Sequence, residues 1–244
     1  MYGLIGRPLG HSFSASFFNE KFKKENIDER YELFPLPYIE KVTELIEQHP
    51  SLKGLNVTIP YKQDIIPFLS RISEEAKEIG AVNVVRIHRD GGKYLLEGFN
   101  SDAIGFKESI QPLLKSYMKK AMILGTGGAS KAVSFVMSSL GFQVIMVSRV
   151  AKSDCISYTD ISPELMSECH VIINATPLGM WPKIEDAPPI PYSLLTPRHL
   201  LFDLIYNPEI TEFMKRGLAK GAIVKNGLEM LYGQAIEAWR IWNE

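Results

Sequence analysis

The chain has 244 residues and a net charge of −1, a length that predicts one or two domains. The basic residues are scattered, which argues against a nucleic-acid partner. No apolar run approaches the length of a membrane span, so we expect no membrane partner. Cys155 and Cys169 match no metal-ligand spacing and make no disulfide framework, which predicts no metal site and a reducing, cytoplasmic location.

A glycine-rich loop at 6–10 follows a short apolar run at 2–5, which predicts a buried strand and a turn. Either Ser12 or Ser14 can cap the helix expected after this loop. Capping needs one serine, whereas two serines beside a glycine-rich loop can also direct both hydroxyls at an anion. Both interpretations stay open at this point.

Polar side chains occupy one face of the strand expected at 55–59, where apolar residues alternate with Asn56 and Thr58. Pro60 ends this strand and Lys62 lies just beyond it. A solvated surface lysine is the simpler interpretation, but its place beside these polar groups makes Lys62 a candidate site residue. Other strands are expected at 31–34, 81–87 and 93–98, and helices at 38–49, 73–79 and 103–115.

Asn83 interrupts an apolar strand, so it is either a core amide with satisfied hydrogen bonds or a ligand contact. The turn at 90–92 contains two glycines and predicts a hairpin. Asp102 precedes the next helix, and its position alone favours a capping role. Regular alternation of strands and helices begins near residue 103, where we place a domain boundary.

A glycine-rich turn between the apolar run at 121–124 and a helix-forming segment at 132–140 marks the second half. Gly125 permits the turn, and Gly127 lets the backbone approach a pyrophosphate. The first helical turn, with Gly128 and Ala129, offers N–H groups to phosphates. A strand at 143–147 completes a βαβ unit, which favours a dinucleotide site over a purely structural turn. Ser130 replaces the last glycine of the usual fingerprint.

Ser148 and Arg149 lie at the end of the strand 143–147, where an NAD site usually has a carboxylate. A guanidinium binds the 2′-phosphate of NADP, so we predict NADP as the cofactor. The alternative is an exposed arginine at a strand end. Further strands are expected at 170–174, 200–206 and 222–225, and helices at 211–220 and 228–242.

About five residues separate Arg149 from the next strand-like run at 155–158, whereas a parallel crossover needs a dozen or more. We therefore predict a third strand that is a weak edge strand or absent, with no helix over that face of the sheet. Lys152 and Ser153 in this short connection can still reach a 2′-phosphate.

Taken together, these motifs resemble the shikimate dehydrogenase family over nearly the whole chain. The motifs that carry the resemblance lie at 11–14, 56–62, 80–83, 100–102, 125–132, 174–180, 203–208 and 226–228. The resemblance implies an α/β fold with an N-terminal substrate-binding domain and a Rossmann-like doubly wound NADP-binding domain, with the active site in the cleft between them. We expect the first domain at 1–102, completed by the C-terminal helix 227–244, and the second at 103–226.

The resemblance also implies an activity, the reversible NADP-dependent reduction of 3-dehydroshikimate to shikimate in chorismate biosynthesis, by a monomer or a homodimer. Lys62 and Asp102 would form the catalytic pair. The substrate carboxylate would contact Ser12, Ser14 and Tyr206, and the ring hydroxyls would contact Asn56, Thr58, Asn83 and Gln234. The cofactor would contact Gly125, Gly127, Gly128, Ala129, Ser148, Arg149, Thr176 and Gly227.

The sequence departs from the family pattern at two positions, and two alternative functions stay open. Ser101 stands where the family usually has Thr, and Ser148 replaces an Asn beside the basic residue. The alternatives are a quinate/shikimate dehydrogenase that prefers NAD and a nucleotide-sensing relative without turnover. Retention of Lys62 and Asp102 argues against the sensor. Because the short connection after Arg149 lies where the family binds adenosine, we expect an open adenosine end and looser NADP binding.

Overall fold

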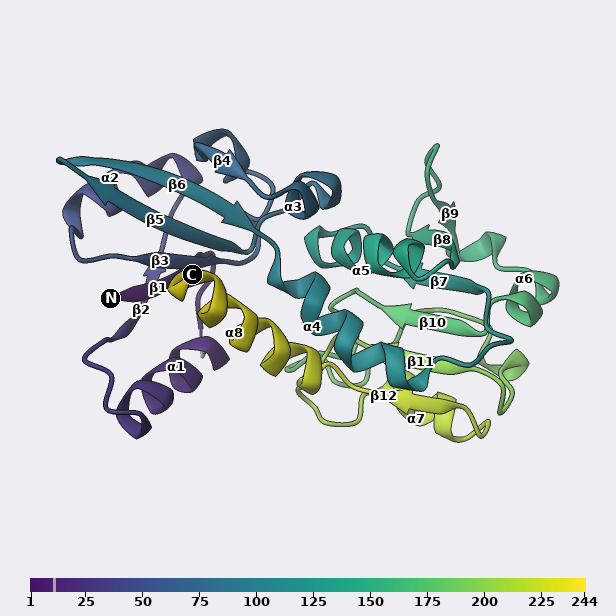
Figure 1. Cartoon of the computed structure of the whole chain (residues 1–244). Helices are drawn as coiled ribbons and strands as arrows, with labels where there is room; N and C mark the ends of the chain where they lie inside the picture. Colours follow the sequence, from purple (N-terminus) through teal and green to yellow (C-terminus); the bar gives the residue numbers. More distant parts are fainter. Residues whose placement is uncertain (11) are drawn as a thin grey trace. The chain divides into compact units, whose positions relative to one another are not determined.

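The computed structural model describes residues 1–10 and 12–244, so His11 of the first motif lies outside the described residues. The chain divides into two compact units (Figure 1). The first contains Met1–Ser101 and Gln234–Glu244, and the second contains Asp102–Gly233. No helix in the described part of the chain is long and apolar enough to cross a bilayer.

The first unit is built on a mixed six-stranded sheet in the order β2-β1-β3-β5-β6-β4. Its strands are β1 (Tyr2–Gly6), β2 (Tyr31–Pro35), β3 (Gly54–Val57), β4 (Arg71–Ile72), β5 (Val84–Asp90) and β6 (Lys93–Phe99). β1 pairs in parallel with β2 and β3, so the carboxyl ends of these three strands meet at one edge. β5 is antiparallel to both β3 and β6.

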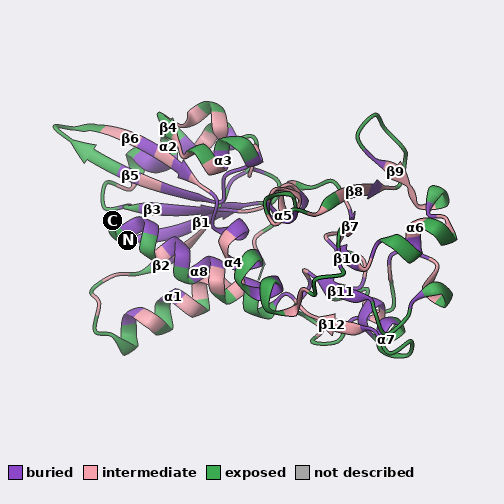
Figure 2. Cartoon of the chain, turned by 45° about the vertical axis from the view of Figure 1, so that its right-hand side comes forward, coloured by how far each residue is buried: buried purple, intermediate pink, exposed green. Residues whose placement is uncertain are grey.

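Helices of the first unit pack against this sheet, whose inner strands are largely buried in Figure 2. They are α1 (Phe13–Lys24), η1 (Ile39–Lys41), α2 (Val42–Gln48), η2 (Ile66–Phe68), α3 (Glu74–Ile79) and, from Gln234 onward, α8 (Leu228–Asn243). One core cluster joins Phe18 of α1, Tyr31 of β2 and Trp242 of α8. The Trp242 indole donates to the carbonyl of Val85 at 3.1 Å, which ties the C-terminal helix to β5.

The second unit is a fully parallel six-stranded sheet in the order β12-β11-β10-β7-β8-β9. Its strands are β7 (Lys120–Leu124), β8 (Gln143–Ser148), β9 (Ile156–Ser157), β10 (Val171–Asn174), β11 (Leu200–Asp203) and β12 (Ile223–Lys225). Its helices are α4 (Ser101–Ile110), η3 (Gln111–Leu113), α5 (Gly128–Ser139), η4 (Tyr158–Asp160), α6 (Pro163–Glu168), η5 (Tyr192–Leu194) and α7 (Glu212–Leu218). The order is that of a doubly wound dinucleotide-binding sheet, which confirms the predicted fold class.

The connection between β8 and β9 confirms the prediction made from its length. Residues 149–155 contain no helix, and Lys152 and Cys155 close a tight turn through two backbone hydrogen bonds of 2.9 and 3.3 Å. β9 has two residues and forms the edge of the sheet beside β8. Figure 2 shows most of this connection exposed, whereas Cys155 at its end is buried.

Two predictions need correction, and one helix was missed. β3 ends at Val57, so the polar face is shorter than predicted, and Ile59 is 72% exposed. β5 runs on through Asp90, and the hairpin turn consists of Gly91 and Gly92 alone, both with positive φ, as a two-residue turn of the favoured hand requires. The helix α6 was not predicted.

Candidate active site

Ser12 caps α1, because its side chain accepts the backbone N–H of Ala15 at 3.5 Å. Ser14 lies in the first turn of the same helix, and its hydroxyl hydrogen-bonds to the Tyr31 phenol. Ser12 is therefore the capping serine that the sequence left undecided, while Ser14 points toward the sheet.

A buried network of hydrogen bonds connects three of the predicted site residues. The Tyr31 phenol donates to Asn56 Oδ1 at 2.7 Å, and Asn56 Nδ2 donates to the carbonyl of Asn83 at 3.3 Å. Asn83 Oδ1 in turn accepts the backbone N–H of Ser101 at 2.7 Å, and its Nδ2 donates to the Ser101 hydroxyl at 3.1 Å. Ser14, Asn56 and Asn83 thus belong to one polar cluster, and Tyr31 is a member that no feature of the sequence singled out.

The turn that carries Lys62 is held by backbone hydrogen bonds. Thr58 donates to the carbonyl of Ile5 at 2.9 Å, and the carbonyl of Lys62 accepts the N–H of Val82 at 2.7 Å. Thr58 and Lys62 are both half-buried. The strand-end turn therefore brings Thr58, Lys62 and the segment around Asn83 to the same edge of the first sheet.

The remaining predicted substrate and catalytic residues lie on other elements. Gln234 is buried on α8, within the first unit. Asp102 is buried in the first turn of α4, and Tyr206 is 40% exposed just after β11, both in the second unit. The predicted set is thus divided between the two units.

The glycine turn between β7 and α5 has the backbone that a dinucleotide site needs. Gly125 has φ +106°, and a side chain there would lie 3.1 Å from the carbonyl oxygen of Ala175. A Cβ added at Gly127 would meet no described atom within 4 Å, so the turn is open where a pyrophosphate would approach. α5 begins at Gly128 with no capping side chain among the described residues, and Ala129 lies in the same first turn. The residues present therefore fit a bound pyrophosphate.

Asn174 and Asp203, at the carboxyl ends of β10 and β11, organise the loops that follow. Asn174 Oδ1 accepts both the N–H and the hydroxyl of Thr176, at 3.0 and 2.6 Å. Asp203 accepts from Asn174 Nδ2 at 3.0 Å and from the Thr211 hydroxyl at 2.6 Å. Burial raises the pKa of the Asp203 carboxyl to about 6, although these hydrogen bonds oppose the change.

Ser148 and Arg149, at the end of β8 and just after it, have different surroundings from each other. The Ser148 hydroxyl bonds to the carbonyl of Val150 and accepts from the Cys155 thiol at 3.4 Å, so it stabilises the short turn. Arg149 is exposed, and its positive charge opposes the rise that burial causes in the pKa of Tyr158. The Arg149 guanidinium is therefore accessible to a ligand.

Gly227 permits a close approach between two segments at the start of α8. Its N–H donates to the carbonyl of Ile205 at 3.0 Å, and an added Cβ would lie 2.1 Å from the carbonyl oxygen of Leu204. Only glycine fits there without movement of the backbone. This contact fixes the start of α8 beside the segment that precedes Tyr206.

The parallel sheet order, the glycine turn and the open start of α5 define the class of dinucleotide-binding α/β proteins, here with an additional unit that carries a polar cluster. A family model described as the shikimate dehydrogenase substrate binding domain matches residues 4–85. A shikimate dehydrogenase (NADP(+)) of Clostridium beijerinckii is 40% identical over 100% of this chain and 92% of its own length.

Two solved structures agree with that finding. Shikimate dehydrogenase from Aquifex aeolicus is 35% identical, with a TM-score of 0.85 over 99% of this chain and 91% of its own. The enzyme from Thermus thermophilus, in complex with NADP(H) and shikimate, is 29% identical, with a TM-score of 0.85 over 99% of this chain and 92% of its own. The chain belongs to the shikimate dehydrogenase family.

Proposed function

We propose that this protein catalyses the reversible, NADP-dependent reduction of 3-dehydroshikimate to shikimate, a step of chorismate biosynthesis. The observation that carries the proposal is the 40% identity to an NADP-dependent shikimate dehydrogenase over the full chain. The polar cluster of the first unit and the glycine turn of the second supply chemistry that suits a polyhydroxy acid and a dinucleotide.

We propose that the polar cluster recognises shikimate. A carboxylate accepts hydrogen bonds, so the hydroxyls of Ser12 and Ser14 can donate to it, with Tyr206 as a further donor. Asn56, Thr58, Asn83 and Gln234 offer amides and a hydroxyl, which can both donate to and accept from ring hydroxyls. Buried polar groups of this kind discriminate strongly against ligands that lack a matching hydroxyl.

Lys62 and Asp102 are proposed as the catalytic pair. Reduction of a carbonyl places negative charge on its oxygen, and an ammonium stabilises that charge and donates the proton. In the reverse direction Lys62 accepts the proton from the hydroxyl. We assign Asp102 the task of orienting the Lys62 ammonium.

NADPH, when bound, supplies the hydride. Gly125, Gly127, Gly128 and Ala129 would hold its pyrophosphate, and Arg149 would bind the 2′-phosphate through charge-assisted hydrogen bonds. We propose further contacts from Ser148, Thr176 and Gly227. Because residues 149–154 form only an exposed turn, the adenosine end of this site is proposed to be open and NADP binding to be loose.

Three further assignments complete the proposal. We propose a substrate-binding domain of 1–102 with 227–244 and a dinucleotide-binding domain of 103–226, functional bounds that differ from those of the two compact units at Asp102 and at 227–233. We also propose a cytoplasmic location, and a monomer or a homodimer as the active form.

Steady-state assays with shikimate and quinate, each with NADP and with NAD, test the proposal. We expect the highest kcat/KM for shikimate with NADP. A preference for NAD with comparable activity on quinate would favour the quinate/shikimate dehydrogenase instead. Nucleotide binding without turnover of either substrate would contradict an enzymatic role and favour a sensor.

A further inference from the structure

Tyr31 is buried in the core of the first unit, with 3% of its surface exposed, yet its hydroxyl lies inside the polar cluster. The ring stacks on Phe18 with centroids 4.9 Å apart, which fixes the direction of the phenol. α1 adds a second support, because the Asn19 side chain pairs with the Tyr31 backbone. Its Oδ1 accepts the Tyr31 N–H at 2.9 Å and its Nδ2 donates to the Tyr31 carbonyl at 3.0 Å.

Tyr31 donates to Asn56, and Asn56 in turn donates to the backbone of Asn83. Burial raises the pKa of the Tyr31 phenol well above its ordinary value, although the hydrogen bond with Ser14 acts in the opposite direction. The phenol therefore keeps its own proton and donates it to Asn56 Oδ1 at 2.7 Å. Asn56 Nδ2 then donates to the carbonyl of Asn83.

This arrangement fixes which end of the Asn56 amide faces which neighbour. Within the described residues, Asn56 Nδ2 has one protein acceptor, the Asn83 carbonyl, which leaves its second N–H for a ligand. The Tyr31 hydroxyl is the group that holds Oδ1. Without it, a buried amide oxygen lacks a donor, and the amide loses one of the two bonds that orient it.

We propose that Tyr31 is a positioning residue for substrate binding, which acts by fixing the Asn56 amide toward the ring hydroxyls of shikimate. This inference rests on the proposed function, since shikimate is the ligand that the amide is assigned to bind. Tyr31 itself is not assigned a contact with the substrate.

The test measures shikimate binding by isothermal titration calorimetry, independently of turnover. Tyr31→Phe keeps the ring and should weaken shikimate binding about 5–30-fold, the range expected when a buried polar group loses its partner. Binding of NADP should be unchanged. Tyr2→Phe is the matched control, because Tyr2 is equally buried in the same aromatic cluster and outside the polar network; it should bind shikimate as the native protein does.

A double-mutant cycle separates positioning from a purely structural role. In an Asn56→Ala background, Tyr31→Phe should change the dissociation constant by less than about twofold, because its effect passes through the Asn56 amide. Equal effects in both backgrounds would overturn the inference, and so would native affinity in Tyr31→Phe.

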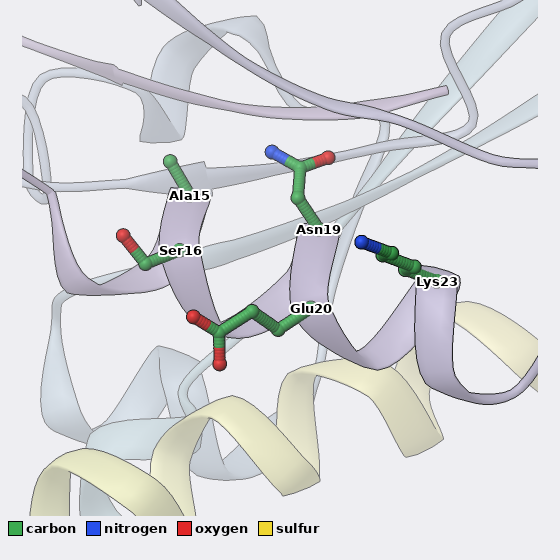
Figure 3. Close-up of a pocket in the computed structure, with 5 residues that line it drawn as sticks. All are labelled: Ala15, Ser16, Asn19, Glu20 and Lys23. Carbon is green, nitrogen blue, oxygen red and sulfur yellow. The ribbon is translucent and has the colours of Figure 1, made fainter.

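Should Tyr31→Phe fail to fold, Asn19→Ala gives an independent measurement. It removes the backbone support of Tyr31 from an exposed position on α1, where Figure 3 shows Asn19 next to Glu20. We expect shikimate binding about 2–5-fold weaker, with Glu20→Ala unchanged as the control. Unchanged binding in Asn19→Ala would overturn the inference.

The outcomes also distinguish this inference from the proposed function. If the native protein oxidises shikimate and Tyr31→Phe binds shikimate with native affinity, the proposed function stands and the role of Tyr31 is overturned. If the native protein binds shikimate without turnover and Tyr31→Phe binds it weakly, the role of Tyr31 stands and the proposed function is contradicted. Absence of shikimate binding to the native protein would contradict both.

Discussion

The Asp203 carboxyl is fully buried at the end of β11, and it accepts hydrogen bonds from Asn174, Ile205 and Thr211. Burial still raises its pKa from 3.8 to about 6, because three hydrogen bonds do not replace the water lost from a carboxylate. Replacement by asparagine keeps the shape of the side chain and removes the ionisation. Asp203→Asn therefore tests how ionisation of this buried carboxyl affects the stability of the folded protein.

The sign of the effect follows from proton linkage. The folded state holds the Asp203 proton more tightly than the unfolded state does, so this group makes the free energy of unfolding fall as the pH rises from about 4 to about 6. A pKa difference of about two units corresponds to about 3 kcal/mol. Above about pH 6 the carboxylate is ionised in both states, and its contribution no longer changes with pH.

Urea unfolding followed by circular dichroism at a series of pH values measures this contribution. Between about pH 4 and about pH 7, we expect the free energy of unfolding of the native protein to fall by about 3 kcal/mol relative to that of Asp203→Asn. Hydrogen exchange in peptides covering β10 and β11 should report the same difference for the second unit. Asp186→Asn, which removes an exposed carboxylate from the same unit, is the control. Parallel pH profiles for the native protein and Asp203→Asn would refute the reasoning.

Three further predictions concern the proposed site. Lys62→Ala should lower turnover by roughly 10²–10⁴ while shikimate binding changes much less, and near-normal turnover would exclude an acid–base role. Arg149→Ala should weaken NADPH binding roughly 10–150-fold in fluorescence titrations and leave NADH little changed; equal losses would show that Arg149 does not bind the 2′-phosphate. Ser14→Ala and Tyr206→Phe should each raise KM for shikimate more than they lower kcat. Equal binding of an analogue without the carboxylate to the native enzyme would contradict that assignment.

Chain length and residue pattern predicted much of the fold. The connection after Arg149 is the clearest case, because a five-residue crossover cannot contain a helix whatever its sequence. The glycine turn is another, since Gly125 adopts a positive φ that favours glycine. α6 was missed although Ser162 and Pro163 are typical of a helix start, because only six residues follow the cap.

Side-chain networks were harder to predict than the backbone. Tyr31 looks like an ordinary strand aromatic, and its bond to Asn56 depends on the placement of β2 and β3 on either side of β1. That strand order is not visible in the local sequence. The sequence marks Asn174 and Asp203 more clearly as candidate site residues, because each is a polar residue that ends an apolar run. Their hydrogen bond nevertheless depends on the pairing of β10 with β11.

The central claim is that this protein transfers a hydride between NADP and the carbinol carbon of shikimate. The most direct test incubates the protein with 3-dehydroshikimate and NADPH that carries deuterium at the transferable position of its nicotinamide, and then analyses the product by mass spectrometry and NMR. We predict shikimate with one deuterium at the reduced carbon, and none in an otherwise folded Lys62→Ala protein sampled over the same short time. Oxidised NADP without labelled shikimate, or no reaction at all, would contradict the claim.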